Sequence, residues 1–543
     1  MPKSVFIKGA LVLSAAAFFS KLLGLFYVIP LKHFAGDEGL ALYQAVFPIY
    51  NTLLILSVSG IPIAISKLIS EEKSKGNTSE VEQIIISAMK MMSVVALTGF
   101  FVFFLGADQL AQWIGNGDTE PSIQGLAFAM LLVPFVALLR GFFYGHQEMA
   151  LPAVSQVIEQ LIRVSLMIGF VYWLVLEGSS IAKVAAGAAW GSFFGLACAL
   201  ALLLVIYFRT SPKISFLAPT QGGYAKKILL FALPVSFSTL MLPIMGMVDS
   251  LTIINLLKAA GLGQLDSTVE FGLYSRGVPI VQFAAFYATA LAVSVVPALA
   301  SEPSQEKKRE KVYQTIKITF LIGVPASIGM MLIAEPLNIL FYGDDKGSEA
   351  LIVLAASTFF LTLSVTASGL LQGLGKPFVP AAFLGVSIIV KIGLNVWLVP
   401  SYGIVGAAYS TLFTYGCIAI LCLHAVLRNM ATPIVPGKQV GRWLLPSVGM
   451  GIAVAWAMSA YLHYAPILSS QRLFSFYEVI LLVIIGLISY GMGLVFCNII
   501  TWQDLSMLWQ DRLMRKQENS RVSVQGEYDI AHIQKKKDGL ERE

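Results

Sequence analysis

Residues 123–145 read IQGLAFAMLLVPFVALLRGFFYG, a mostly apolar run that contains one charged residue, Arg140. A helix of about 20 apolar residues is long enough to cross the hydrocarbon core of a bilayer, which is about 30 Å thick. No water is available at that depth to pair with backbone amides, so such a run must fold as a helix. The stretch therefore predicts a membrane-spanning helix.

Similar runs recur along the whole chain of 543 residues, of which 57% are hydrophobic and 13% are charged. A soluble domain has about a quarter charged residues, and a mean hydropathy of +0.77 leaves too little polar surface to cover a soluble core. We expect an all-α polytopic membrane protein with about 14 transmembrane helices. The expected spans are 8–31, 39–68, 83–106, 123–146, 150–177, 180–208, 227–256, 271–300, 313–336, 350–373, 377–399, 403–428, 442–463 and 474–498.

The distribution of lysine and arginine predicts the orientation of these spans. With the N-terminus placed in the cytoplasm, most of the 37 basic residues fall in cytoplasmic segments and few in external loops, as the positive-inside rule requires. We therefore expect both termini in the cytoplasm. From Trp502 onward, apolar residues at helical spacing predict an interfacial helix, and after Lys516 the polar composition predicts disorder.

Two stretches of the chain resemble each other. Residues 140–145 (RGFFYG) correspond to 368–373 (SGLLQG), and Arg163 corresponds to Lys391, at one offset of 228 positions. Pro152 and Pro380 share that offset. Because the offset covers six helices, the two halves should have the same orientation, as in parallel repeats with a binding site between them.

The repeat predicts the domain organisation. We expect an N-terminal lobe of six helices at 1–225, a C-terminal lobe of six helices at 226–430, two additional helices at 431–498, and a cytoplasmic tail at 499–543. The four cysteines and five histidines show no spacing typical of metal ligands, so we expect no metal site and no cofactor.

Basic residues lie within the predicted spans, Lys21, Arg163 and Lys391 near the middle and Arg140 and Arg276 nearer the ends. A charge at the bilayer centre costs several kcal/mol unless it faces a wet cavity or a partner. Such positions are therefore candidates for a functional site.

Few acids are available to neutralise these cations. Glu159 lies four residues before Arg163 and could pair with it, and Gln156 extends the same polar face. Asp249 could neutralise one further charge, whereas Lys21 and Lys391 have no obvious acid nearby. Basic residues at depth outnumber acids, which favours a cationic cavity that binds phosphate or pyrophosphate.

Each cation also has a structural alternative. Arg140 could extend to the cytoplasmic interface, Arg163 could serve only as the partner of Glu159, and Arg276 could anchor the outer end of its helix. The cavity hypothesis requires instead that Lys21, Arg276 and Lys391 face a shared opening, and that they are not each matched by a carboxylate.

The motif at 140–145, followed by 155–163 (SQVIEQLIR), resembles the polysaccharide-transporter branch of the multidrug/oligosaccharidyl-lipid/polysaccharide exporter superfamily. Within it, the chain is most similar to the stage V sporulation protein B-like group, which is similar to the lipid II flippases. The segments 20–24 (SKLLG), 61–67 (IPIAISK) and 276–280 (RGVPI) add to this likeness.

The resemblance implies a V-shaped bundle of two six-helix lobes in the bacterial cytoplasmic membrane. It further implies outward movement of undecaprenyl-pyrophosphate-linked oligosaccharides or peptidoglycan precursors by alternating access, with Lys21, Lys67 and Arg276 lining the cavity. The flippases often carry a second basic residue where this chain has Tyr27. This departure leaves both lipid II and other lipid-linked glycans open as cargo.

Three other functions compete with this interpretation. A cation-coupled multidrug exporter of the same superfamily would need acids in its lobes, such as Asp249. A polytopic glycosyltransferase would need sizeable external loops, which the predicted spans do not leave, so we do not expect an enzyme. A scaffold for envelope assembly would need no transport.

The expected partners are a lipid-linked saccharide and membrane lipids, with envelope-synthesis proteins as further candidates and no nucleic acid.

Overall fold

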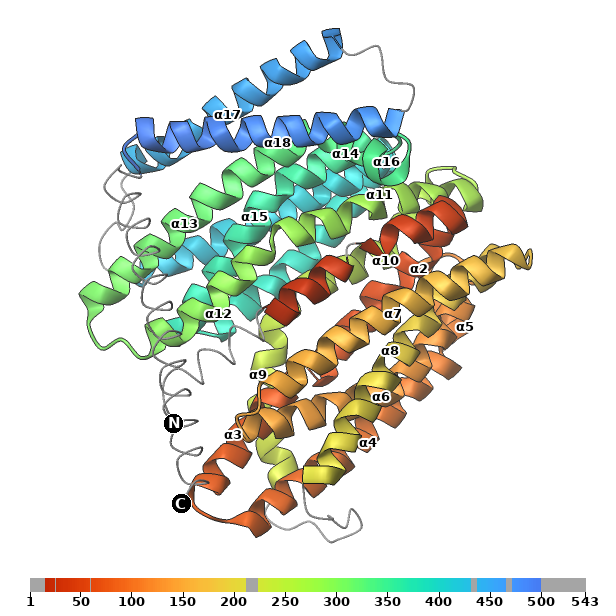
Figure 1. Cartoon of the computed structure of the whole chain (residues 1–543), viewed down its shortest axis with the longest axis vertical. Coiled ribbons are helices and arrows are strands. Elements are labelled where there is room, and N and C mark those ends of the chain that lie inside the picture. The colour runs from red at the N-terminus through yellow and green to blue at the C-terminus, as the bar shows by residue number, and fades with distance from the viewer. Residues whose placement is uncertain are drawn as a thin grey trace, which may run out of the picture.

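The computed structural model describes residues 15–24, 26–58, 60–210, 223–430, 437–464 and 471–499, and every regular element in these ranges is helical (Figure 1). The all-α fold class is therefore confirmed. The predicted interfacial helix from Trp502 and the polar tail lie outside the described residues.

The first half of the chain forms one group of packed helices, which we call the N lobe, at the lower right of Figure 1. In it α6 packs on α3, α4 and α8, and α7 packs on α8. The elements of the N lobe are α2 (Val28–Val58), α3 (Ile61–Ser74), α4 (Thr78–Leu105), α5 (Ala107–Ile114), the short 3-10 helix η1 (Gly117–Thr119), α6 (Glu120–Gly145), α7 (Ala150–Leu176) and α8 (Ile181–Thr210). The helical residues 15–24 precede α2.

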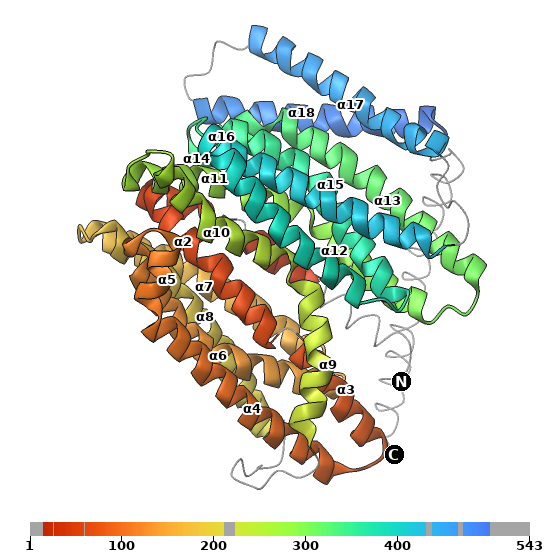
Figure 2. The same cartoon turned by 180° about the vertical axis from the view of Figure 1, so that it is seen from behind.

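The second half forms the C lobe, in which α15 packs on α12, α13 and α16, and α10 packs on α16. Its helices are α10 (Met241–Ala259), α11 (Gln264–Ala284), α12 (Phe286–Ala300), α13 (Gln305–Leu332), α14 (Ala334–Tyr342), α15 (Ser348–Gly373) and α16 (Phe378–Arg428). Two last helices, α17 (Gly437–Tyr464) and α18 (Gln471–Phe496), pack on α13 and α14 at the side of the C lobe away from the N lobe (Figures 1 and 2).

Twelve helical segments of the described chain are long and apolar enough to cross a membrane. Two of them are hairpins rather than straight rods, because Gly36 and Gly403 have non-helical backbone angles with positive φ. Across Gly36 the rings of Tyr27 and Tyr43 lie 5.8 Å apart, whereas a straight helix would separate these residues by about 24 Å. Across Gly403 the hydroxyl of Ser410 donates to the carbonyl of Lys391 at 3.3 Å. The count of about fourteen crossings stays a prediction, which the two hairpins favour.

The span predicted at 227–256 is interrupted at Leu240, where α9 (Tyr224–Thr239) ends and α10 begins. The α9 half packs on α3 and α4 of the N lobe, while the α10 half packs on α16 and α2. The contact between α3 and α9 depends on Gly60, since a Cβ there would lie 2.1 Å from the backbone oxygen of Ala232. The chain between the lobes is thus shared by both, and the proposed domain boundaries stay predictions.

Candidate functional site

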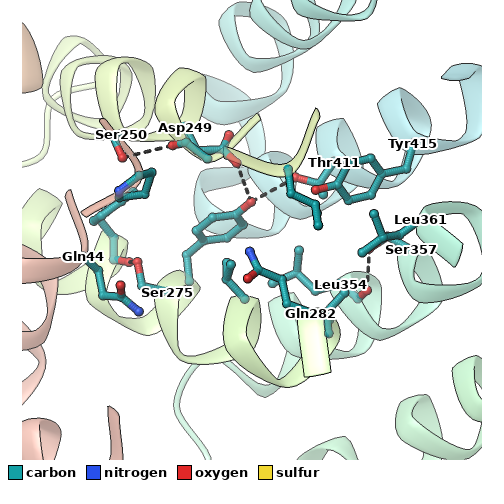
Figure 3. Close-up of a pocket in the computed structure, with 17 residues that line it drawn as sticks. Gln44, Asp249, Ser250, Ser275, Gln282, Leu354, Ser357, Leu361, Thr411 and Tyr415 are labelled. Carbon is teal, nitrogen blue, oxygen red and sulfur yellow. Dashed lines mark hydrogen bonds between the residues drawn. The ribbon is translucent and has the colours of Figure 1, made fainter. Parts of the chain in front are cut away.

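A cavity of about 60 Å³ lies between the two lobes (Figure 3). Gln44 and Pro48 of α2 form its wall on the N-lobe side, and the rest of its lining comes from α10, α11, α15 and α16. Its polar groups include the carboxylate of Asp249 and the hydroxyls of Thr411 and Tyr415. A space of this size holds a few water molecules but no sugar headgroup. We call it the central cavity.

Lys391 lies behind the wall of the central cavity. Its ammonium nitrogen is 2.8 Å from Oδ1 of Asp249, and both side chains are buried. The expectation that Lys391 has no acid nearby is therefore wrong. The sequence could not reveal this pair, because α10 contributes Asp249 from a distant part of the chain.

Three more residues complete what we call the C-lobe cluster. Asn395 donates from Nδ2 to Oδ1 of Asp249 at 3.0 Å, and the hydroxyl of Tyr274 donates to Oδ2 at 2.9 Å. Thr411 accepts a hydrogen bond from the Lys391 ammonium at 2.6 Å. The cluster is thus electrically neutral, and its charges are hydrogen-bonded. These are the conditions under which a buried ion pair is tolerated.

Arg163 of α7, the repeat counterpart of Lys391, has different surroundings. Its Nη2 donates to the hydroxyl of Tyr43 at 3.2 Å, and its guanidinium lies 4.9 Å from the centre of the Phe47 ring. It forms no ion pair with any residue in the described part of the chain. The positive charge of Arg163 is therefore held by a hydroxyl and an aromatic face rather than by a carboxylate.

The acid predicted to neutralise Arg163 is used elsewhere. Oε2 of Glu159 lies 2.8 Å from Nη2 of Arg140 on the neighbouring helix α6, and Ser155 accepts a second hydrogen bond from Arg140 at 3.0 Å. The expected pairing of Glu159 with Arg163 is therefore wrong. Gln156 is half-buried on the same helix.

Lys21 lies in the helical residues before α2, and its side chain is exposed to solvent although protein surrounds it on most sides. It makes no hydrogen bond or ion pair with another described residue, and its strongest electrostatic neighbour is Arg163. Two like charges therefore lie near each other in the N lobe.

The positions of these charges repeat between the lobes. The offset of 228 that relates Arg163 to Lys391 also relates Lys21 to Asp249. The C-lobe pair is an acid and a base in contact, whereas the N-lobe pair consists of two bases that repel each other. An anion bound between Lys21 and Arg163 would remove that repulsion.

A second charged network joins the lobes at the end of the bundle where the first hairpin turns. Nη2 of Arg276, on α11, lies 2.6 Å from Oδ1 and 2.7 Å from Oδ2 of Asp37, which follows Gly36. Nη1 of Arg276 lies 2.5 Å from Oδ1 of Asp344, and Lys32 lies 2.7 Å from Oδ2 of the same carboxylate. We call Lys32, Asp37, Arg276 and Asp344 the interlobe lock.

The interlobe lock is tightly built. A Cβ on Gly272 would lie 2.2 Å from the backbone oxygen of Asp37, so only glycine lets α11 approach the hairpin this closely. Partial burial raises the pKa of Asp344, but hydrogen bonds from Arg276 and Lys32 outweigh it and bring the pKa to about 2. The carboxylate therefore stays charged at neutral pH.

None of the three cations named in the cavity hypothesis lines the central cavity, so the part of the requirement that asks for a shared opening is not met in this conformation. Arg276 and Lys391 have carboxylate partners in this conformation, and Lys21 has none among the described residues. Lys67 of α3 lies apart from them, half-exposed, 3.8 Å from Glu71 and 4.5 Å from the centre of the Phe231 ring. The candidate cations thus do not form one cluster.

Sequence reasoning missed Asp37, Asp344, Tyr274, Asn395 and Tyr43. Asn395 lies four residues after Lys391, so helical spacing could have indicated it. Asp37 and Asp344 fall within predicted loops, where acidic residues are ordinary and give no signal of a partner.

Comparisons with known proteins give the relationships of this chain. A family model described as polysaccharide biosynthesis protein matches residues 6–301, and the MatE model matches residues 234–397. The uncharacterized membrane protein YabM of Bacillus subtilis is 34% identical over 83% of this chain and 89% of its own length. The lipid II flippase MurJ of the same organism is 26% identical over 85% of this chain and 90% of its own length. The stage V sporulation protein B of Bacillus subtilis is 27% identical over 80% of this chain and 85% of its own length.

Solved structures give the same picture of the fold. An inward closed conformation of the lipid II flippase MurJ superposes with a TM-score of 0.68 at 14% identity and covers 93% of this chain and all of that one. An inward-facing multidrug resistance MATE family transporter gives a TM-score of 0.61 at 17% identity, over 76% of this chain and 94% of that one. At these identities the likeness concerns the fold.

Proposed function

Since the chain belongs to the polysaccharide biosynthesis protein family of the multidrug/oligosaccharidyl-lipid/polysaccharide exporter superfamily, we propose that it is a flippase for lipid-linked saccharides. Its cargo is an oligosaccharide or peptidoglycan precursor on an undecaprenyl-pyrophosphate-type lipid. The protein carries it from the inner to the outer leaflet of a bacterial plasma membrane, with both of its own termini in the cytoplasm. Transport proceeds by alternating access and requires no catalytic residue.

The observation that carries this proposal is the pair of unneutralised cations in the N lobe. Lys21 and Arg163 lie near each other without a carboxylate among the described residues. Placing two like charges together at membrane depth is unfavourable unless an anion or water compensates them. Paired basic side chains suit a pyrophosphate, which accepts several charge-assisted hydrogen bonds.

Arg163 also accounts for the departure from the flippase pattern at Tyr27. The Tyr27 ring contacts Tyr43, whose hydroxyl accepts the hydrogen bond from Arg163. The guanidinium of Arg163 therefore lies in the same aromatic cluster as the position where flippases often carry their second basic residue. This supports a pyrophosphate-linked cargo and leaves open which glycan it carries.

The interlobe lock and the small central cavity fit one state of an alternating-access cycle. Because Asp37 and Arg276 bridge the first hairpin and α11, the lobes are closed at that end, and the central cavity is too small for cargo. Rupture of the lock would let the lobes separate there. Under this proposal Arg276 switches between Asp37 and the cargo phosphates, and Arg140 positions α7 through Glu159.

The test is transport in proteoliposomes of a fluorescent undecaprenyl-pyrophosphate disaccharide, with a phosphate-free undecaprenyl disaccharide as a comparison cargo. We expect the wild-type protein to move the pyrophosphate cargo and not the neutral one. Arg163→Ala should lower the rate about 10- to 100-fold, because it removes a hydrogen bond to a charged group worth about 1.5–3 kcal/mol. Lys183→Ala, at an exposed position of α8, should transport like wild type. Equal transport by Arg163→Ala and wild type would refute the proposal.

A further inference from the structure

Lys391 of the C-lobe cluster could bind an anionic cargo, but its ammonium is already paired with Asp249. Lys391 is fully buried, and its ammonium reaches Asp249 and Thr411, both of which line the central cavity. The ammonium thus lies one side chain away from that cavity. The opposite wall belongs to the N lobe, through Gln44 and Pro48. Separation of the lobes would therefore open the cavity next to Lys391.

We infer that Lys391 is exchanged between Asp249 and the phosphate of the cargo, and that Asp249 takes up a proton when the lysine leaves. This inference rests on the proposed anionic cargo. A phosphate in the enlarged cavity competes with Asp249 for the same ammonium. Asp249 is buried, and a buried carboxylate that loses its counter-charge favours the protonated form. The proton comes from cavity water, which exchanges with bulk solvent once the lobes have parted.

The neighbours of Asp249 allow such an exchange. Within the described residues, the titratable and charged groups facing it are Lys391 from the first arm of α16, Tyr274 from α11 and Tyr415 from the second arm. Tyr274 and Asn395 donate hydrogen bonds to the carboxylate, and neither carries a charge that could replace the ammonium. The loss of Lys391 thus leaves Asp249 without a counter-ion, and protonation is the available way to neutralise it.

The charge balance distinguishes this arrangement from a permanent ion pair. Before exchange, Lys391 and Asp249 sum to zero. After exchange, the ammonium neutralises one phosphate charge, and the protonated carboxyl is neutral. Each cargo bound at Lys391 is therefore accompanied by one proton, so binding depends on pH and a proton gradient can influence transport.

The first test needs no cargo. The infrared band of a protonated carboxyl group should be absent from wild type at pH 7 and present in Lys391→Met, because the ammonium that keeps Asp249 ionised is gone. The double variant Asp249→Asn/Lys391→Met should lack the band, which assigns it to Asp249. Asp266→Asn, at an exposed position of α11, serves as the control and should resemble wild type. If Lys391→Met folds without the band, Asp249 does not take up a proton when its partner is lost, and the inference fails.

The second test measures protons released or taken up when undecaprenyl pyrophosphate binds the detergent-solubilised full-length protein in weakly buffered solution. We expect about one proton taken up per molecule bound to wild type and none for the double variant, which removes both members of the pair and is expected to fold. Binding to wild type without proton uptake would overturn the exchange and leave the proposed flippase intact. Absence of binding to wild type would overturn both.

Discussion

Arg163 and Lys391 occupy corresponding positions in the two lobes, yet their charges are handled in opposite ways. Lys391 contacts Asp249 at 2.8 Å, whereas Arg163 contacts a tyrosine hydroxyl and an aromatic face. At the position of Asp249, the N lobe has Lys21. Corresponding positions thus supply a neutral cluster in the C lobe and a doubly positive pair in the N lobe.

The remaining charges of the N lobe preserve this difference. Glu159 could have neutralised Arg163, but its carboxylate forms an ion pair with Arg140 instead. The offset of 228 places Ser368 and Ser387 at the positions of Arg140 and Glu159, so the C lobe has hydroxyls there instead of an ion pair. The comparison teaches that corresponding positions can carry a neutralised charge in one lobe and an unneutralised charge in the other, depending on which acids pack nearby.

The largest effect on folding is expected from removing the acid of the C-lobe cluster. Asp249→Ala leaves Lys391 buried without a counter-ion, and breaking a buried pair in this way costs about 3–5 kcal/mol. Thermal unfolding in detergent should show a large loss of stability. Asp249→Ala/Lys391→Met should recover most of it, because no buried charge remains. Equal stability of the single and double variants would mean that the two side chains are not coupled.

The next largest effect is expected from giving the N lobe the charges of the C lobe. Lys21→Asp would supply Arg163 with a carboxylate, as Asp249 does for Lys391. We expect transport of the pyrophosphate cargo to fall about 100-fold, because competing for Arg163 costs the cargo about 2–3 kcal/mol. Stability should stay the same or rise. Lys21→Met should reduce transport less, and a smaller loss in Lys21→Asp than in Lys21→Met would contradict the proposed asymmetry.

The fold was largely accessible from the sequence because bilayer physics leaves few choices. Apolar runs of the right length must be helices, and the repeat of Arg163 and Lys391 was readable from spacing. The break at Leu240 was not predicted, since an apolar run gives no signal of which lobe each half of a helix will contact. The hairpin turn at Gly36 falls between two predicted spans, and the turn at Gly403 falls on the first residue of the predicted span 403–428.

The site was less accessible, because its decisive partners come from distant segments. The pairing of Glu159 with Arg163 was inferred from helical spacing, but the neighbouring helix α6 places Arg140 closer to the acid. Asp249 was recognised as an acid that could neutralise one charge, while its partner depended on how α10 packs on α16. Spacing within a helix identifies candidate pairs, and only packing between helices selects among them.

A smaller effect is expected from weakening the interlobe lock. Asp37→Asn removes one of the two carboxylates that hold Arg276, while Asp344 remains at 2.5 Å. The cost should be about 1.5–3 kcal/mol, the contribution of a hydrogen bond to a charged group. Amide hydrogen exchange in residues 28–40 and at the start of α11 should become faster. Asp118→Asn, at an exposed position of η1, is the control. Unchanged exchange in Asp37→Asn would show that the lock does not hold the hairpin.

The smallest effect is expected from mild acid on the same lock, which contrasts it with the C-lobe cluster. The pKa of Asp344 is lowered to about 2 by Arg276 and Lys32, so its stabilising contribution is fully present above its ordinary pKa of about 3.9. That contribution is lost only as the pH falls from about 4 through 2. Once the pH dependence of the intrinsic exchange rate is corrected for, hydrogen exchange at the hairpin should therefore be insensitive to pH between about 5 and 8. Cargo binding in the same range should instead be accompanied by uptake of a proton at Asp249. A hairpin that loosens between pH 8 and 5 would mean that another titrating group controls the lock, and the contrast between a pH-insensitive lock and a proton-coupled C-lobe cluster would not hold.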